Sequence, residues 1–303
     1  MGLLGKWVES LDYEYEISTS CTRHRSPHSS CEKCIAVCEE KAITLVNNKP
    51  VIERDKCSEC GNCISACSTQ SISGIYPKRT VINNQLLITR EHTPTVKELL
   101  VLRKKGVKVI VSEEPSLNGA WKHVVEETNS MLDQLGEEPF TISNKAIEKA
   151  EESYSRRELF SLWKKSSQSL MVQATPAKWR FTHSDLDLEK YYPDYQFTSI
   201  AVDPNTCTLC KACNILCAKK CLTISETSFI VATQSCSSCQ LCADICPEKA
   251  ITIKELISAV NDIHYPIHKK QCSVCNQPYN TLREDDEKCV MCSTKREGYL
   301  SSN

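Results

Sequence analysis

The spacing of the cysteines constrains this chain more than any other feature. The sequence holds 21 cysteines in 303 residues, and 20 of them fall into five groups. Such regular spacing indicates metal ligands rather than disulfides. Three groups share the spacing C-x2-C-x2-C-x3-C: Cys57, Cys60, Cys63 and Cys67; Cys207, Cys210, Cys213 and Cys217; and Cys236, Cys239, Cys242 and Cys246. A fourth group keeps the last three positions of this run, Cys31, Cys34 and Cys38, and its nearest upstream cysteine is Cys21.

The run suits a cubane iron-sulfur cluster, which has four irons and needs one thiolate for each. Three cysteines two residues apart let a short loop wrap three corners of the cube while its amide groups point at the sulfurs. We expect the fourth cysteine to open a helix and to ligate the other cluster of a two-cluster module. The runs form pairs, because Cys38 and Cys57 are 19 positions apart and so are Cys217 and Cys236. The sequence therefore predicts two paired modules with up to four 4Fe-4S clusters.

Both modules resemble the bacterial-type two-cluster 4Fe-4S ferredoxin family, over residues 18–78 and 200–256. An offset of 179 positions superposes them, so that residues 41–44 fall on 220–223 and residues 71–73 on 250–252. An internal repeat of this kind argues for an architecture and not only for a motif. The chain departs from the family pattern because, of the four closing cysteines, only Cys246 is followed by a proline.

The resemblance implies a crossed ligand pattern, in which the last cysteine of each run serves the other cluster of its module. One corner is irregular, because the position of Cys207 falls on His28 under the offset and the nearest cysteine is Cys21. A thiolate suits a cluster iron better than an imidazole does, so Cys21 is preferred. The alternatives are His28, which would raise the potential of that cluster, and an open corner on a three-iron cluster. The implied sets are Cys21 or His28 with Cys31, Cys34 and Cys67; Cys38 with Cys57, Cys60 and Cys63; Cys207, Cys210, Cys213 and Cys246; and Cys217 with Cys236, Cys239 and Cys242.

The one cysteine outside the five groups is Cys221. It falls on Ala42 under the offset, just after the fourth ligand of its run. We expect a buried small side chain there, because free cysteines are most often buried and inert. A ligand or a regulatory thiol is the alternative.

The last group of cysteines is of a different kind. Cys272 and Cys275 form one C-x2-C pair, and Cys289 and Cys292 form another after 13 intervening residues. Two such knuckles close a tetrahedral site of four thiolates, and we predict one structural zinc in a zinc-ribbon-like tail. A segment this short hardly buries a core, whereas structural zinc contributes on the order of 10 kcal/mol. Rubredoxin-type iron is the rival metal, but its knuckles usually carry a glycine after the second cysteine.

The whole chain is expected to be an α+β protein of five segments. Residues 79–142 predict a small β-α-β-α-β domain, with strands over 85–88, 107–111 and 139–142. Its first helix is expected to run from Thr93, with Pro94 in the first turn, to Gly106, and its second helix to end at Gly136. Residues 143–199 predict a helical connector and a loop. The remaining segments are the modules at 1–78 and 200–258 and the tail at 265–303.

Bulk properties exclude several classes of function. The formal net charge is -1, and no apolar stretch approaches the length of a membrane span, so neither a nucleic-acid site nor a membrane span is expected. The N-terminus does not read as a secretory signal, which favours a cytoplasmic protein. No glycine-rich phosphate loop and no C-x3-C-x2-C motif is present, which argues against nucleotide binding and against radical chemistry on S-adenosylmethionine.

The expected function is electron transfer. In overall plan the chain is similar to the multi-cluster ferredoxin-type subunits of hydrogenases, formate dehydrogenases and other anaerobic reductases. The resemblance implies a protein that passes single electrons between a donor and a separate catalytic oxidoreductase subunit, with no catalytic residue of its own in view. The alternative is an iron-sulfur redox-sensing regulator that binds nucleic acid or a protein through the zinc ribbon.

Overall fold

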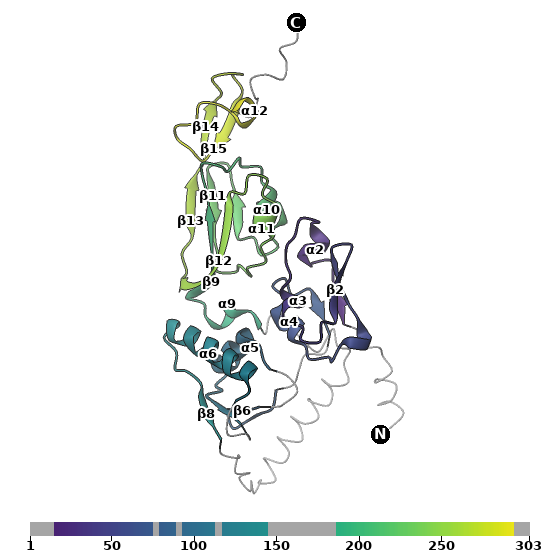
Figure 1. The fold of residues 1–303 in the computed structure, drawn as a ribbon. Helices are drawn as coiled ribbons and strands as arrows, with labels where there is room; N and C mark the ends of the chain where they lie inside the picture. The colour runs from purple at the N-terminus through teal and green to yellow at the C-terminus, as the bar shows by residue number, and fades with distance from the viewer. Residues whose placement is uncertain (1–14, 75–78, 89–92, 113–116, 145–185, 294–303) are drawn as a thin grey trace, which may run out of the picture. The chain divides into compact units, whose positions relative to one another are not determined.

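The computed structural model describes residues 15–74, 79–88, 93–112, 117–144 and 186–293 (Figure 1). These residues belong to two compact units: residues 1–21 with 32–191, and residues 22–31 with 192–303. The expected connector helix, from Lys145 to about Met171, lies outside the described residues. None of the described helices is long and apolar enough to cross a membrane.

Short helices and small sheets make up a mixed α/β structure. The first unit contains β1 (Glu16–Ile17), α3 (Lys33–Ala36), β2 (Ile43–Val46), β3 (Lys49–Ile52), the 3-10 helix η1 (Arg54–Lys56), α4 (Asn62–Ala66), β4 (Ile72–Ser73), β5 (Val81–Ile82), β6 (Gln85–Leu87), α5 (Val96–Lys104), β7 (Val109–Val111), α6 (Gly119–Gln134), β8 (Thr141–Ser143) and α9 (Leu188–Tyr191). The second contains α2 (Thr22–Arg25), β9 (Tyr195–Val202), α10 (Ala212–Leu216), β10 (Leu222–Ile224), β11 (Ser228–Val231), α11 (Leu241–Asp244), β12 (Ile251–Ala259), β13 (Ile263–Pro266), β14 (His268–Gln271), β15 (Pro278–Thr281) and α12 (Val290–Ser293).

Residues 79–144 form a four-stranded sheet in the order β5-β6-β7-β8. Strands β6, β7 and β8 are parallel, and α5 and α6 connect them, so the expected β-α-β-α-β order is present. Leu86 on β6 and Ile110 on β7 are neighbours in register and fully buried. The short strand β5, which pairs antiparallel with β6, was not predicted, because two residues are too few to show a strand pattern.

The start of α5 differs from the expectation. The helix begins at Val96 and not at Thr93, because Thr95 occupies the N-cap. Its hydroxyl accepts a hydrogen bond from the backbone N–H of Glu98 at 3.3 Å, which satisfies one of the free amides of the first turn. Asn118 caps α6 in the same way, accepting from the N–H of Trp121 at 2.9 Å.

Both helices end as the sequence predicts. Gly106 and Gly136 follow the C-caps with φ angles of 97° and 68°, a left-handed conformation that favours glycine. The N–H groups of Val107 and Glu137 donate to the carbonyl of Leu102 and that of Leu132, respectively, at 3.0 and 2.8 Å. This is the bond that closes a Schellman motif.

A buried ion pair holds α5 to the segment before β5. The guanidinium of Arg79 donates to both carboxylate oxygens of Glu98, at 2.6 and 3.1 Å, and the side chains are only 8% and 4% exposed. Glu98→Gln leaves the buried Arg79 charge uncompensated, so we expect α5 to lose about 3–5 kcal/mol of stability. Hydrogen exchange across α5 measures this loss.

The matched control for that variant is Glu126→Gln on α6. Glu126 lies 3.9 Å from Lys122, and both side chains are 67% exposed. This change should cost no more than about 0.5 kcal/mol. Equal protection of α5 in the two variants would show that the buried pair contributes little.

The two cysteine-rich regions repeat the same elements. The offset of 179 carries α3 onto α10, β3 onto β11, α4 onto α11 and β4 onto the first residues of β12. In each region a hairpin, β2–β3 or β10–β11, follows the first run of cysteines. The pairs β1–β4 and β9–β12 are both antiparallel. The duplication that the sequence indicates is therefore present in the backbone.

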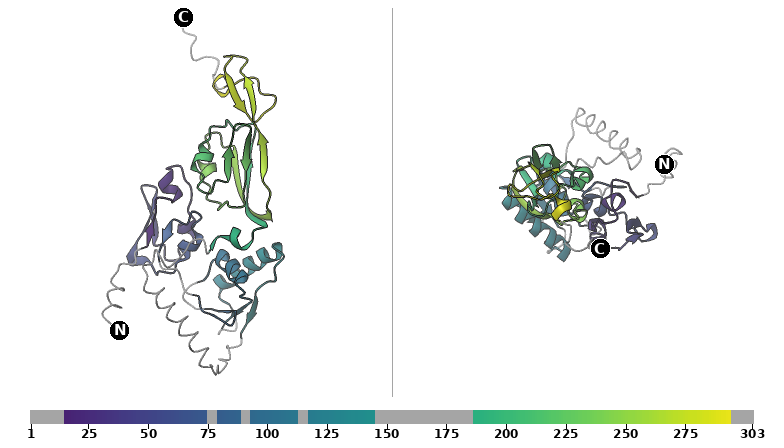
Figure 2. Two further views of the ribbon diagram at one scale, coloured as in Figure 1. Left: turned by 180° about the vertical axis from the view of Figure 1, so that it is seen from behind. Right: turned by 90° about the horizontal axis from the view of Figure 1, so that it is seen from above.

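The second region is larger than the first. Strand β9 begins at Tyr195, inside the stretch expected to be loop, and strand β13 adds a third member to the sheet β10-β11-β13. Helices α10 and α11 lie on one side of these strands, and the hairpin β14–β15 with α12 follows β13 (Figures 1 and 2). Phe229 and Val231 are fully buried between the sheet and its neighbours, and Ile267 and Leu282 of the tail join the same core. The tail thus continues the second region without a linker.

Residues 22–31 belong to the second unit, although the expected first module, residues 1–78, includes them. The amide and the hydroxyl of Ser30 donate to the carboxylate of Asp244 on α11, at 2.8 and 2.9 Å. A bond between residues so far apart in sequence cannot be read from local spacing.

Candidate metal and cluster sites

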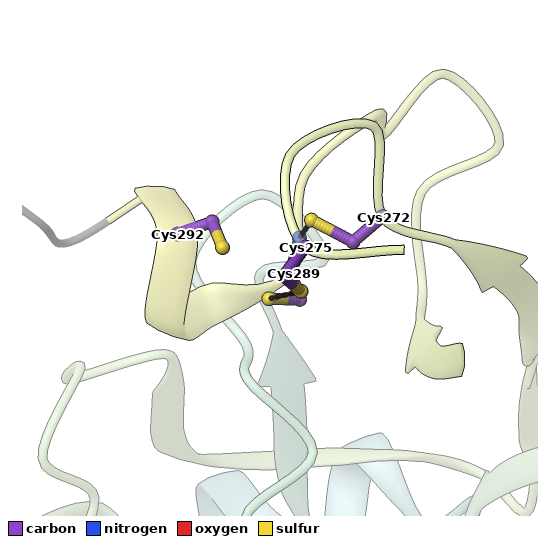
Figure 3. A group of neighbouring side chains, drawn as sticks. All are labelled: Cys272, Cys275, Cys289 and Cys292. Atoms are coloured by element: carbon purple, nitrogen blue, oxygen red, sulfur yellow. Dashed lines mark hydrogen bonds between the residues drawn. The ribbon is translucent and has the colours of Figure 1, made fainter. Parts of the chain in front are cut away.

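The four cysteines of the tail converge on one point. The sulfur atoms of Cys272, Cys275, Cys289 and Cys292 all lie within 4.8 Å of one another (Figure 3). Zinc holds thiolates at about 2.3 Å in a tetrahedron, which separates the sulfurs by about 3.8 Å. The sulfurs of Cys275 and Cys289 are 3.8 Å apart. This group could hold a metal ion.

Two local structures aim these sulfurs. Cys272 follows β14, and the chain then turns through Asn276, whose φ of 57° and N–H bond to the Cys272 carbonyl at 2.9 Å form a tight knuckle. Cys289 precedes α12, which carries Cys292. The amides of Cys275 and Cys289 donate to the Cys272 sulfur and lower its pKa to about 6. This donor set favours a thiolate, the form that binds metal.

The fourth cysteine of each of the other four runs closes a helix or turn and does not open a helix. Cys67 and Cys217 are the C-caps of α4 and α10, so the expectation of a helix after these cysteines is wrong. A residue with a left-handed backbone follows three positions later and directs the chain into the next strand. These residues are Lys41, Gln70, Lys220 and Lys249, with φ between 51° and 54°.

That turn gives each fourth cysteine the same hydrogen bond. The backbone N–H four positions on donates to its sulfur in all four runs. The bonds are Ala42 to Cys38 at 3.2 Å, Ser71 to Cys67 at 3.2 Å, Cys221 to Cys217 at 3.3 Å and Ala250 to Cys246 at 3.3 Å. Amide donation to sulfur stabilises negative charge there.

The loops of the three regular runs also share a backbone. Each has two left-handed residues, one just before and one just after its second cysteine: Glu59 and Gly61, Leu209 and Lys211, and Ser238 and Gln240. The amides of Glu59, Leu209 and Ser238 donate to the sulfurs of Cys57, Cys207 and Cys236, respectively. Alternating left- and right-handed residues form a nest of N–H groups that suits an anion or an iron-sulfur cluster.

The first run, which contains Cys31, lacks these two left-handed residues. Its corresponding residues are Ser30 and Glu32, neither of which has a positive φ; the φ of Glu32 is -130°. The run that is irregular in sequence is therefore irregular in its loop as well.

Three sets of four thiols lie close enough to affect one another's pKa. Burial raises the pKa of Cys63 to about 12 and that of Cys213 to about 11, and neighbouring sulfurs add to both shifts. Burial likewise raises the pKa of Cys242. The neighbours that raise these values are Cys60, Cys34, Cys57 and Cys38 for Cys63; Cys207, Cys210 and Cys246 for Cys213; and Cys239, Cys236, Cys217 and Cys213 for Cys242. In each case the fourth cysteine of the other run of the pair is among these neighbours.

Two cavities coincide with these sets. One is lined by Cys38, Cys57, Cys60 and Cys63, and the other by Cys207, Cys210, Cys213 and Cys246. Among the described residues, only the tail cysteines are close enough for a single ion. Thiolates around a cubane stand further apart, because the cluster lies between them.

Unpartnered buried oxygens occur at these runs. Four buried side-chain oxygens in the described part of the chain have no hydrogen-bond partner: those of Thr22, Asn62, Ser68 and Ser238. Each belongs to a residue directly beside a cysteine of the runs, and buried polar groups ordinarily have a partner. The Asn62 oxygen is an amide carbonyl and can only accept, but the other three are hydroxyl groups, which can donate to sulfide. These three residues therefore fit an iron-sulfur group.

Tyr15 lies beside the thiols of one of these sets, and its role was not predicted. It lines the cavity of Cys57, Cys60 and Cys63, and its hydroxyl donates to the carbonyl of Glu59 at 3.0 Å. Burial, and then the charge of the neighbouring sulfurs, raises its pKa well above the usual range. The sequence signal was weak, because the residue stands alone 42 positions before Cys57.

Strand pairing bears on the choice between Cys21 and His28. Ser18 donates its N–H to the carbonyl of Ser71 at 2.8 Å, as Asp203 does to Ala250 at 2.8 Å. Ser18 therefore matches Asp203, and Cys21 falls one position before the place of Cys207. Cys21, Cys34 and Cys67 belong to the first unit whereas Cys31 and His28 belong to the second, so the first ligand set stays a prediction.

Cys221 is buried, at 2% exposed, as expected for a residue in the place of Ala42, which is 1% exposed. All 21 cysteines lie in the described residues, and none of them forms a disulfide there.

Comparison with known proteins adds no family. No family model matches the chain, and no curated protein matches it.

Proposed function

We propose that the chain is an electron-transfer protein that binds up to four 4Fe-4S clusters and one structural zinc, and that it passes single electrons between a donor and a separate catalytic oxidoreductase subunit. The observation that carries the proposal is the crossed grouping of thiols. In three sets, three cysteines of one run lie near the fourth cysteine of the partner run. Crossed ligation of this kind is typical of two-cluster modules.

The chain supplies the cluster environment from named residues. The nests around Glu59, Leu209 and Ser238 direct amides at the thiolates, and the turns after the fourth cysteines add one amide each. These donors stabilise negative charge and fix the sulfur positions. A 4Fe-4S cluster, when bound, supplies one-electron redox chemistry. At the first set, strand pairing favours Cys21 over His28 as the fourth ligand.

Zinc is the metal that the tail suits best. The tail provides four thiolates at tetrahedral spacing and leaves no open position, which is typical of a structural site. Asn276 and Ser293 follow the second cysteines of the knuckles, where rubredoxin-type iron sites usually have glycine.

Anaerobic purification followed by metal analysis and EPR of the reduced protein tests the proposal. We expect about 16 iron atoms and one zinc per chain, with reduction by a low-potential donor and onward transfer to an acceptor. Fewer than about 12 iron atoms after full reconstitution would rule out four clusters. Salt-sensitive nucleic-acid binding without electron transfer would favour a regulator instead.

Tyr15 should protect the second cluster from solvent and oxygen. Tyr15→Ala opens the wall of its cavity, so we expect the visible absorbance to bleach several-fold faster in air, with an unchanged iron content under anaerobic conditions. Tyr15→Phe keeps the ring and loses the hydroxyl bond to the Glu59 carbonyl, so it should bleach at close to the original rate. The same rate in the alanine variant would contradict a shielding role.

A further inference from the structure

The turn after Cys67 differs in chemistry from the turns that follow the fourth cysteines of the other three runs. Residues 68–71 include Ser68, Thr69 and Ser71, whereas residues 39–42, 218–221 and 247–250 contain neither serine nor threonine. Ser71 is 2% exposed and Ser68 is 8% exposed, and the Ser68 hydroxyl has no hydrogen-bond partner in the described part of the chain. Cys67 thus has hydroxyl-bearing neighbours that the other three fourth cysteines lack.

Four hydroxyl groups form a hydrogen-bonded chain that ends at the Cys67 sulfur. Thr69 Oγ1 lies 3.8 Å from Cys67 Sγ and 2.6 Å from Ser71 Oγ. Ser71 Oγ lies 2.9 Å from Ser20 Oγ, which lies 2.6 Å from Ser18 Oγ. The pairing of β1 with β4 brings these residues together, because Ser18 follows β1, Ser71 precedes β4, and the N–H of Ser18 donates to the carbonyl of Ser71.

This hydroxyl chain has one direction when Cys67 binds an iron of the first cluster. A cysteine that binds a metal does so as a thiolate, which can only accept a hydrogen bond, so Thr69 donates to it. Because a hydroxyl has one proton, Ser71 then donates to Thr69, Ser20 donates to Ser71, and Ser18 donates to Ser20. Hydrogen bonds in a chain polarise one another, so the aligned O–H groups together favour negative charge on the sulfur.

We propose that Thr69 is a positioning residue for the first cluster, and that its hydroxyl, with the hydroxyl chain behind it, raises the reduction potential of that cluster; the inference rests on the proposed function, in which Cys67 is a ligand. Reduction adds negative charge that is shared with the ligand sulfurs. A donor aimed at one of those sulfurs stabilises the reduced form more than the oxidised form. The third cluster, which Cys246 serves in the equivalent position, lacks these hydroxyl groups, so the two equivalent clusters differ in potential.

An EPR-monitored redox titration of the reconstituted full chain tests the inference. The midpoint potential that disappears in Cys34→Ala is that of the first cluster. Thr69→Val keeps the size of the side chain and removes the hydroxyl, so we expect about 16 iron atoms to remain while that midpoint becomes more negative. The expected shift is about tenfold in the reduction equilibrium, or about 59 mV for one electron. Thr69→Ser keeps the hydroxyl and should keep the midpoint of the wild type.

Two further variants separate the hydroxyl chain from the strand pairing around it. Ser20→Ala interrupts the chain further from the sulfur and should cause a smaller shift in the same direction. Ser73→Ala is the matched control, because the Ser73 hydroxyl links the same two strands by donating to the Glu16 carbonyl at 3.4 Å but is not part of the chain. This variant should leave every midpoint in place.

The outcomes distinguish the inference from the proposed function. An unmoved midpoint with full iron content in Thr69→Val would overturn the inference alone, and so would an equal shift in Thr69→Ser or in Ser73→Ala. If Thr69→Val lost about four iron atoms, Ser20→Ala would decide, because it leaves the contact of Thr69 with Cys67 in place, and an unmoved midpoint there would overturn the inference. A wild-type chain that binds no clusters would overturn the proposed function before any variant is measured.

Discussion

Cys60→Ala is expected to lower the iron content of the purified protein from about 16 to about 12 atoms per chain. Cys60 is one of the three cysteines in the loop that, with Cys38 of the partner run, lines one cavity. Without one thiolate a cubane loses a corner and becomes labile. Metal analysis and the EPR signal of the reduced protein measure the loss. Ser58→Ala in the same loop is the control and should keep all of the iron.

Pairs of substitutions test the crossed pattern itself. Cys38→Ala with Cys60→Ala should remove no more iron than either change alone, because both residues serve one cluster. Cys34→Ala with Cys60→Ala should remove about eight atoms, because these residues serve two clusters. If the first pair also removed about eight atoms, each run would hold its own cluster and the crossed assignment would be wrong.

Cys289→Ser is expected to abolish zinc binding and to unfold the tail. Structural zinc in small domains contributes on the order of 10 kcal/mol, and residues 268–293 have only a two-stranded hairpin and one short helix of their own. Zinc content and hydrogen exchange over this segment measure the effect, while the iron content should not change.

Met291→Ala is the matched control for the zinc site. Met291 lies on α12 between two of the proposed zinc ligands and is 73% exposed, so Met291→Ala should leave both the zinc content and the hydrogen-exchange protection of the tail unchanged.

Full zinc content in the Cys289→Ser variant would show that three thiolates suffice. Iron in place of zinc in the wild-type tail would instead favour the rubredoxin-type site.

The sequence predicts most of what depends on local spacing. The two C-x2-C pairs, Cys272 with Cys275 and Cys289 with Cys292, predict the four-cysteine group, because two such turns supply the four thiolates of a tetrahedral site. The ends of α5 and α6 follow from Gly106 and Gly136, since a left-handed residue stops a helix at a definite place.

Features that depend on distant residues could not be predicted. Tyr15 reaches the thiols of its cavity through the fold alone, and strand β13 joins β11 across more than 30 residues. The start of α5 after the N-cap Thr95 was missed for another reason. A proline suits the first helical turn, but a threonine one position later can cap the helix through its hydroxyl, and the cap decides the boundary.

The left-handed residues around the cysteines also bear on how the protein matures in the cell. Leu209, with φ of 52°, is a bulky residue in a conformation that costs on the order of 1–2 kcal/mol, and several other non-glycine residues share it. The bound clusters would offset that cost, whereas a chain without them would relax its loops. Under the proposed function, newly made protein would therefore settle into these loop conformations as its clusters are assembled.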